Sequence, residues 1–117
     1  MRRRVAAVIA LVLALSPLPV VAQQGPDIGY KENIALKVGQ SVVIYGFRGD
    51  CGKLPNRREI SVPATKTSKI AFGRDGWRLS KRCGGKTPAV ELVFTATAVG
   101  REAIKIQGDD IRIRVSQ

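Results

Sequence analysis

The chain has 117 residues, a formal net charge of +11 at pH 7, two cysteines and no histidine. The absence of histidine excludes Ser-His-Asp and Cys-His catalytic arrangements and removes the commonest zinc ligand. We therefore expect a small, basic protein that is not an enzyme and that holds no cofactor and no metal.

The first 22 residues have the pattern of a signal peptide. Three arginines at 2–4 precede an uncharged apolar run at 5–15, and Val20 and Ala22 are small residues at the −3 and −1 positions of a cleavage site. The apolar run is shorter than the about 20 residues that a membrane-spanning helix needs. We predict cleavage after Ala22, export to the periplasm or the medium, and no transmembrane segment in the mature chain. An uncleaved anchor is the alternative.

Removal of 22 residues from 117 leaves 95, which fits a single domain. Residues 23–33 predict a lead-in without regular structure, because Gly25-Pro26 and Gly29 interrupt any period. Residues 34–117 are predicted to form the domain itself.

The middle of the chain predicts short β-strands. Two apolar, β-branched runs at 34–47 flank Gly39-Gln40 and indicate a hairpin or a strand-turn-strand unit. A short edge strand is predicted at 58–64, where a proline ends the run. At 68–81, Asp75-Gly76 lies between apolar runs and predicts a second hairpin.

The last third shows the clearest strand pattern. Apolar and polar residues alternate there with period two, and Gly100 and Gly108-Asp109-Asp110 supply turns, the two aspartates being interpreted as a turn and not as a calcium site. The alternation is strictest at the end, where the apolar positions are Ile111, Ile113 and Val115. Six or seven short strands in about 95 residues predict an all-β fold, an antiparallel β-sandwich.

Cys51 and Cys83 predict one disulfide bond, because an oxidising compartment favours pairing of the two cysteines. A structural zinc site needs four ligands, a thioredoxin-type pair needs the C-x-x-C spacing, and a catalytic thiolate needs a histidine base. The chain offers none of these. A crosslink closing this loop is expected to stabilise the fold by roughly 3–4 kcal/mol.

Two segments carry a resemblance to a known fold family. "LKVGQSVVI" at 36–44 and "FTATAVGREAIKI" at 94–106, followed by the final alternating strand, resemble bacterial immunoglobulin-like domains. In those domains a V-G-x-x-x-x-I turn opens the fold and F-x-A-x-x-x-G-x-x-x-I forms a late strand pair. The resemblance implies an immunoglobulin-like sandwich and no activity. It leaves open whether the disulfide crosses the core or ties a loop to a strand end.

A narrower resemblance is to chagasin-type inhibitors of cysteine peptidases, which share this fold, a similar opening turn and a Gly-Gly loop. Here 83–86, "CGGK", is similar to that loop. The N-P-T-T-G-Y loop is replaced by "GDCGKLPNRR" at 49–58, and the R-P-W element by "GDDIRIRV" at 108–115. With one loop of three, the resemblance makes peptidase inhibition an alternative function.

Positive charge concentrates around the cysteines. Without the arginines at 2–4 the chain keeps 17 basic and nine acidic residues, a net charge of +8. Residues 48–86 hold 11 basic and three acidic residues, also +8, so the rest of the chain sums to zero. Such a surface attracts anions in a salt-dependent way. We predict a binding face made of Arg48, Lys53, Arg57, Arg58, Lys81, Arg82 and Lys86.

The expected partner is an anionic component of the cell envelope or an acidic protein. Nucleic acid is disfavoured, because no aromatic residues alternate with the basic ones to stack on bases. Two alternatives stay open besides inhibition: a solvated face that only keeps the domain soluble, and a structural subunit that pairs through an edge strand at 111–115. The oligomeric state is left open.

Overall fold

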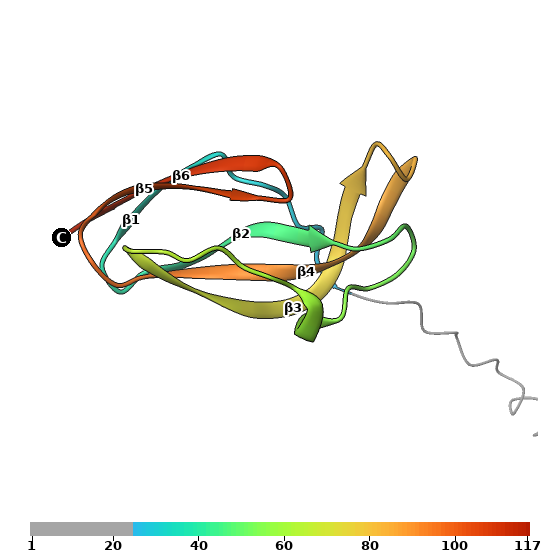
Figure 1. Ribbon diagram of the computed structural model, residues 1–117, viewed down its shortest axis with the longest axis horizontal. Coiled ribbons are helices and arrows are strands. Elements are labelled where there is room, and N and C mark those ends of the chain that lie inside the picture. The colour runs from blue at the N-terminus through green and yellow to red at the C-terminus, as the bar shows by residue number, and fades with distance from the viewer. Residues whose placement is uncertain (1–24) are drawn as a thin grey trace, which may run out of the picture.

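The computed structural model describes residues 25–117, so the predicted signal peptide at 1–22 lies outside the described part of the chain. Within that part, no helix is long and apolar enough to cross a membrane. One short 3-10 helix, η2 (Arg57–Glu59), accompanies six strands (Figure 1). The strands are β1 (Asn33–Lys37), β2 (Ser41–Arg48), β3 (Ser68–Ser80), β4 (Gly85–Ala96), β5 (Gly100–Ile106) and β6 (Asp109–Ser116).

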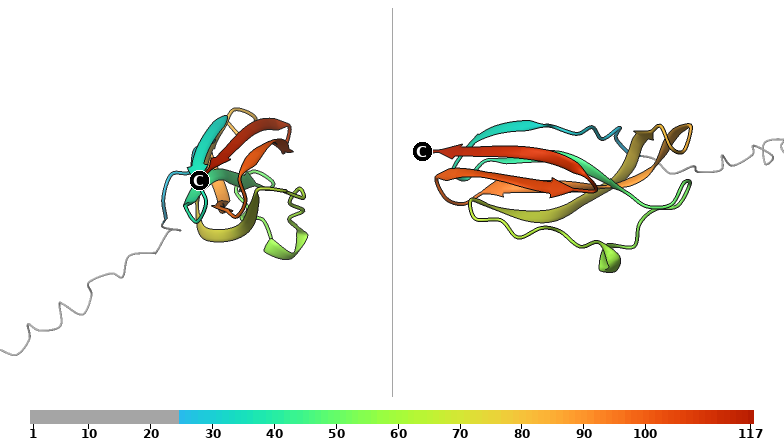
Figure 2. Two further views of the ribbon diagram at one scale, coloured as in Figure 1. Left: turned by 90° about the vertical axis from the view of Figure 1, so that its left-hand side faces the viewer. Right: turned by 45° about the horizontal axis from the view of Figure 1, so that its top comes forward.

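The six strands form two three-stranded sheets, with the spatial orders β1-β6-β5 and β2-β4-β3, which pack as two layers (Figure 2). This confirms the predicted all-β sandwich. Neighbouring strands run antiparallel, except that β1 runs parallel to β6.

The core lies between the two sheets and follows from the period-two alternation. In β6, Ile111, Ile113 and Val115 are buried and the residues between them are exposed. Tyr45 and Phe94 of the facing sheet are fully buried against the same core. Burial of apolar surface contributes about 25 cal/mol per Å², so this layer is what holds the sheets together.

The predicted second hairpin at 68–81 is wrong. These residues form one long strand, β3, with an irregularity in its pairing between Phe72 and Asp75. The glycine of Asp75-Gly76 serves close packing and not a turn, because a Cβ at Gly76 would lie 2.4 Å from the carbonyl oxygen of Pro26.

That contact belongs to the described part of the predicted lead-in, 23–33. The Trp77 N–H donates to the Pro26 carbonyl at 2.9 Å, and the Ile28 N–H donates to the Trp77 carbonyl at 2.7 Å. Ile28 is buried. The lead-in is therefore fastened along β3 before β1 begins.

The predicted edge strand at 58–64 is also wrong. The chain instead makes η2, and the side chain of Asn56 caps it by accepting a hydrogen bond of 3.0 Å from a backbone N–H. Arg57 fastens the segment to β3, because its guanidinium donates to the Gly73 carbonyl at 2.9 Å and to Asp75 at 2.7 Å. Side-chain contacts thus replace the ladder of main-chain bonds that a strand would need.

The unit at 34–47 is a strand-turn-strand and not a hairpin, because β1 and β2 belong to different sheets.

The prediction that 111–115 is an edge strand is wrong. β6 is the central strand of its sheet, since the parallel pairing with β1 covers the side that β5 leaves open.

The disulfide Cys51–Cys83 is present, with its Cα atoms 5.4 Å apart. It joins the turn that follows β2 to the turn between β3 and β4, so it ties two turns at one end of the molecule and does not cross the core. A hydrogen bond of 2.9 Å from the Gly52 N–H to the hydroxyl of buried Thr87 holds the same two segments.

A half-buried carboxylate joins the two sheets at the other end. Glu102 of β5 accepts hydrogen bonds from the backbone N–H groups of Lys66 and Thr67, just before β3, at 2.9 and 2.6 Å, and also from the Thr67 hydroxyl. Burial raises the pKa of Glu102, but these hydrogen bonds and the charge of Lys66 outweigh it and lower the pKa below its ordinary value.

Replacement of both cysteines by alanine is expected to lower the free energy of unfolding by about 3–4 kcal/mol, because the reduced chain regains the entropy of a long loop. Urea denaturation followed by Trp77 fluorescence measures the change. An unchanged midpoint would show that the crosslink does not stabilise the fold.

Glu102→Gln is expected to cost about 1–3 kcal/mol at pH 7, because an amide nitrogen would face the donors of Lys66 and Thr67. A lowered folded pKa stabilises above the ordinary value of about 4.3, and this stabilisation is lost as the pH falls through the folded pKa. The difference between the two proteins in urea denaturation should therefore shrink between pH 7 and pH 3. An equal difference at both pH values would contradict this role.

Candidate anion-binding site at the disulfide end

The two crosslinked turns, 49–53 and 81–84, form what we call the disulfide end. Both project beyond the β1-β6-β5 sheet, at the opposite end from the C-terminus (Figures 1 and 2). An open pocket of about 690 Å³ lies between these turns and the β5–β6 turn. It is lined by Tyr30, Arg48, Gly49, Arg78, Leu79, Ser80, Lys81, Arg82, Cys83, Gln107 and Asp109.

Asp109 organises the floor of this pocket. Its Oδ2 accepts a hydrogen bond of 2.6 Å from the hydroxyl of buried Tyr45 and lies 3.4 Å from Nη2 of Arg78 and 4.0 Å from Nη2 of Arg48. Burial, and then the bond to Asp109, raise the pKa of Tyr45, so its hydroxyl stays a donor. One carboxylate thus positions two guanidinium groups.

Arg78 is held on every side. Its Nη1 donates to the Gly46 carbonyl at 2.9 Å, and its guanidinium lies 4.3 Å from the ring centroid of Tyr45, in cation–π geometry. Only 11% of its side chain is exposed. Arg78 is therefore a structural cation that contributes fixed positive potential to the pocket.

Arg48 is fixed through both its backbone and its side chain. Its backbone N–H and C=O pair with the side-chain amide of Gln107 at 3.0 and 2.6 Å, and its Nη1 donates to the Leu79 carbonyl at 3.1 Å. Gln107 and Gly108, with φ of 48° and 87°, form the tight turn that presents this amide. The orientation of Arg48 is thus set before any ligand arrives.

Lys81 and Arg82 complete the site. Both are exposed, and neither forms an ion pair with an acid of residues 25–117. Four cationic side chains and one carboxylate therefore line the pocket. Such an excess of positive charge around a concave surface attracts an anion.

The structure brings together only part of the predicted binding face. Arg48, Lys81 and Arg82 share the pocket. Lys53 is exposed on the crosslinked turn beside them, and Arg58 is exposed on η2.

Arg57 and Lys86 are engaged elsewhere. Arg57 binds Asp75 at 2.7 Å, and Lys86 binds Asp27 at 3.0 Å. The charged segment 48–86 also reaches beyond this end, because Lys69 lies at the far end of β3 and Lys66 lies just before that strand.

Sequence reasoning missed Arg78, Asp109 and Tyr30. No motif marks them, because they come from separate strands and from the lead-in. The sequence offered one sign of Asp109. It opens a strand directly after a two-residue turn, where its side chain can reach residues of the facing sheet.

Two apolar side chains stand beside these cations. Leu79 is 67% exposed and Leu54 is 37% exposed. Leu79 adjoins the pocket, and Leu54 follows Lys53 in the chain. The disulfide end is therefore both basic and partly apolar.

Asp109→Asn is expected to lower the free energy of unfolding by about 1–3 kcal/mol, because Arg48 and Arg78 would keep their charges without a counter-charge. Thermal unfolding followed by circular dichroism measures this. Asp110→Asn is the matched control, since that neighbouring carboxylate makes only an exposed ion pair with Lys105. If both changes lowered the free energy of unfolding equally, Asp109 would not stabilise the fold by balancing Arg48 and Arg78.

Comparisons with protein-family models, with curated proteins and with solved structures found no match to this chain. The resemblances to immunoglobulin-like domains and to chagasin-type inhibitors stay predictions.

Proposed function

We propose that this protein is an exported, non-catalytic binding module with an immunoglobulin-like fold, whose disulfide end binds an anionic surface of the cell envelope. One observation carries the proposal. Lys53, Lys81 and Arg82 of the two crosslinked turns form no ion pair with another residue of 25–117, exposed Leu54 follows the first turn, and exposed Leu79 lines the same pocket as Lys81 and Arg82.

This combination suits an anionic membrane surface better than a free anion. Each lysine or arginine near such a surface contributes about 1 kcal/mol of attraction. The leucines can enter the boundary between headgroups and acyl chains, where burial of apolar area adds to the electrostatic term. The crosslink fixes the two turns relative to each other, which lowers the ordering cost of binding.

An acidic protein is the alternative ligand, and it would contact the same cations. The two ligands differ in whether the leucines contribute to binding. An acidic protein surface can be held by charge alone, whereas a membrane needs the apolar contact for firm binding.

Peptidase inhibition is the second candidate, and one observation favours it. The turns 49–53 and 81–84 and the β5–β6 turn all border the same pocket, as the loops of a wedge would. The β5–β6 turn is too short to project, however, because β5 ends at Ile106 and β6 begins at Asp109. Inhibition of papain at nanomolar concentration would favour this candidate over the membrane.

The test is co-sedimentation with vesicles of phosphatidylcholine, with and without phosphatidylglycerol. We expect binding to the anionic vesicles only. The triple change Lys53→Gln, Lys81→Gln and Arg82→Gln should weaken it by about 100-fold, since three cations each contribute about 1 kcal/mol. Leu79→Ser should weaken it by roughly tenfold or more, from the loss of one buried leucine.

The matched control is Lys37→Gln, Lys66→Gln and Lys69→Gln, which removes the same charge from the opposite end. It should change binding less than the first triple variant. If both triple variants lost the same vesicle affinity, binding would depend only on net charge. If Leu79→Ser left the affinity unchanged, an acidic protein would be the better candidate ligand.

A further inference from the structure

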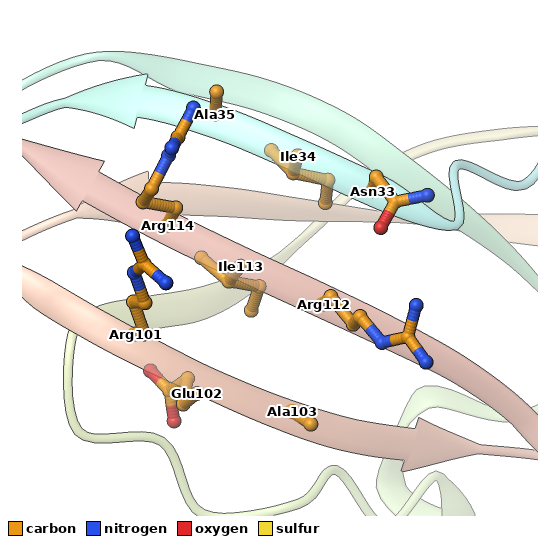
Figure 3. Close-up of a pocket in the computed structure, with 9 residues that line it drawn as sticks. All are labelled: Asn33, Ile34, Ala35, Arg101, Glu102, Ala103, Arg112, Ile113 and Arg114. Atoms are coloured by element: carbon orange, nitrogen blue, oxygen red, sulfur yellow. The ribbon is translucent and has the colours of Figure 1, made fainter.

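A second basic surface lies on the other sheet, away from the disulfide end. Arg101 of β5 and Arg112 and Arg114 of β6 are all exposed on the outer face of the β1-β6-β5 sheet, and we call these three residues the arginine face. Arg101 and Arg114 are direct partners in the β5–β6 register, and Arg112 lies two residues along the same strand. Figure 3 shows the three side chains spread over the two strands.

The three guanidinium groups lack an ion-pair partner within the described part of the chain. Asp110, the acid on the same face, lies 3.3 Å from Lys105. Glu102 follows Arg101 but turns inward to Lys66 and Thr67. Among residues 25–117, no ion pair involves any of the three arginines. Like charges placed directly opposite each other destabilise a sheet, so the free protein holds an unfavourable arrangement that an anion would relieve.

The surface between the arginines is shallow and small-sided. A groove of about 490 Å³ runs over it, and the exposed residues beside the arginines are Asn33, Ala35 and Ala103 (Figure 3). The exposed large apolar side chains of the described residues are Val38, Leu54, Val62, Phe72, Leu79 and Val99, and none of them lines this groove.

These features favour a chain of oxyanions over a protein. The core of a protein–protein interface is apolar and rich in large side chains, whereas the exposed apolar residues that line this groove are only the alanines Ala35 and Ala103. Guanidinium groups bind phosphate and sulfate through two parallel hydrogen bonds. Directly paired residues of adjacent strands are about 5 Å apart, and residues two apart on a strand about 7 Å, so several anionic groups at such spacing can meet all three arginines.

We propose that the arginine face binds a linear polyanion through two or three consecutive phosphate or sulfate groups. This site is independent of the proposed function, because it uses another face and none of the residues of the disulfide end.

The experiment is titration of the ¹⁵N-labelled protein with sodium tripolyphosphate and, separately, with a heparin hexasaccharide, followed by amide chemical shifts. We expect saturable shifts at 101–103 and 112–114, with inorganic phosphate binding at least tenfold more weakly. The stronger of the two probes identifies phosphate or sulfate as the source. The variant Arg101→Gln with Arg114→Gln should lose at least tenfold in affinity.

Lys105→Gln is the matched control, because it removes one charge from the same face at a side chain that Asp110 already balances. It should change the affinity less than threefold, whereas Arg114→Gln alone should exceed that. Equal effects would overturn the proposal in favour of a diffuse field. Shifts confined to 81–84 would also overturn the proposal and would place the polyanion at the disulfide end. Tighter binding of poly-glutamate than of either probe would overturn the proposal in favour of an acidic protein.

A second measurement keeps the test independent of folding defects. Arg114→Gln should raise the melting temperature by a few degrees at low salt, because it removes a cross-strand repulsion, and tripolyphosphate should stabilise the unmodified protein more than the variant. A lower melting temperature of the variant without ligand would show that Arg114 serves the fold.

Discussion

The placement of a few carboxylates determines where this protein is positively charged. The chain has nine acidic side chains against 20 basic ones. Asp27, Asp75, Glu91, Asp109 and Asp110 each pair with a basic side chain, and Glu102 is taken by backbone donors. Because five of these acids each pair with a particular basic side chain, the remaining positive charge collects where basic side chains outnumber the acids near them.

Two such places differ in what surrounds the cations. At the disulfide end, a covalent bridge holds two turns together, and exposed Leu79 lines the same pocket as Lys81 and Arg82. On the arginine face, a regular sheet spaces the guanidiniums and leaves only small side chains between them. The first arrangement suits a surface with an apolar layer beneath its charge, and the second suits a fully hydrated chain.

Much of the fold could be predicted from the sequence, because period-two alternation and a cysteine pair act locally. The strand pattern of 111–115 and the disulfide are confirmed for that reason. Two predicted elements, the hairpin at 68–81 and the edge strand at 58–64, were wrong because contacts between distant segments override the local pattern. Gly76 was interpreted as a turn residue, whereas it lets Pro26 approach β3, a contact between segments that no local pattern encodes.

The candidate site was harder to predict, because summing charge along a segment ignores pairing in space. Arg57 belonged to the charged stretch, yet Asp75 neutralises it. Without the arginines at 2–4, the residues outside 48–86 sum to zero, yet Arg101 and Arg114 share one outer surface while Glu102 is held by backbone donors and Asp110 pairs with Lys105. The strand register and the face of the sheet on which a side chain lies decide which charges are paired. Both are properties of the assembled sheets.

The parallel alignment of β1 and β6 has one more consequence. β6 carries the chain away from the crosslinked turns, so the C-terminus emerges at the opposite pole (Figure 1). A molecule standing on its disulfide end would therefore keep its flank uncovered, with the guanidiniums of β5 and β6 facing sideways into solvent. One copy could then bind a membrane surface through its disulfide end and a soluble polyanion through its arginine face at the same time, because the two surfaces face different directions and do not overlap.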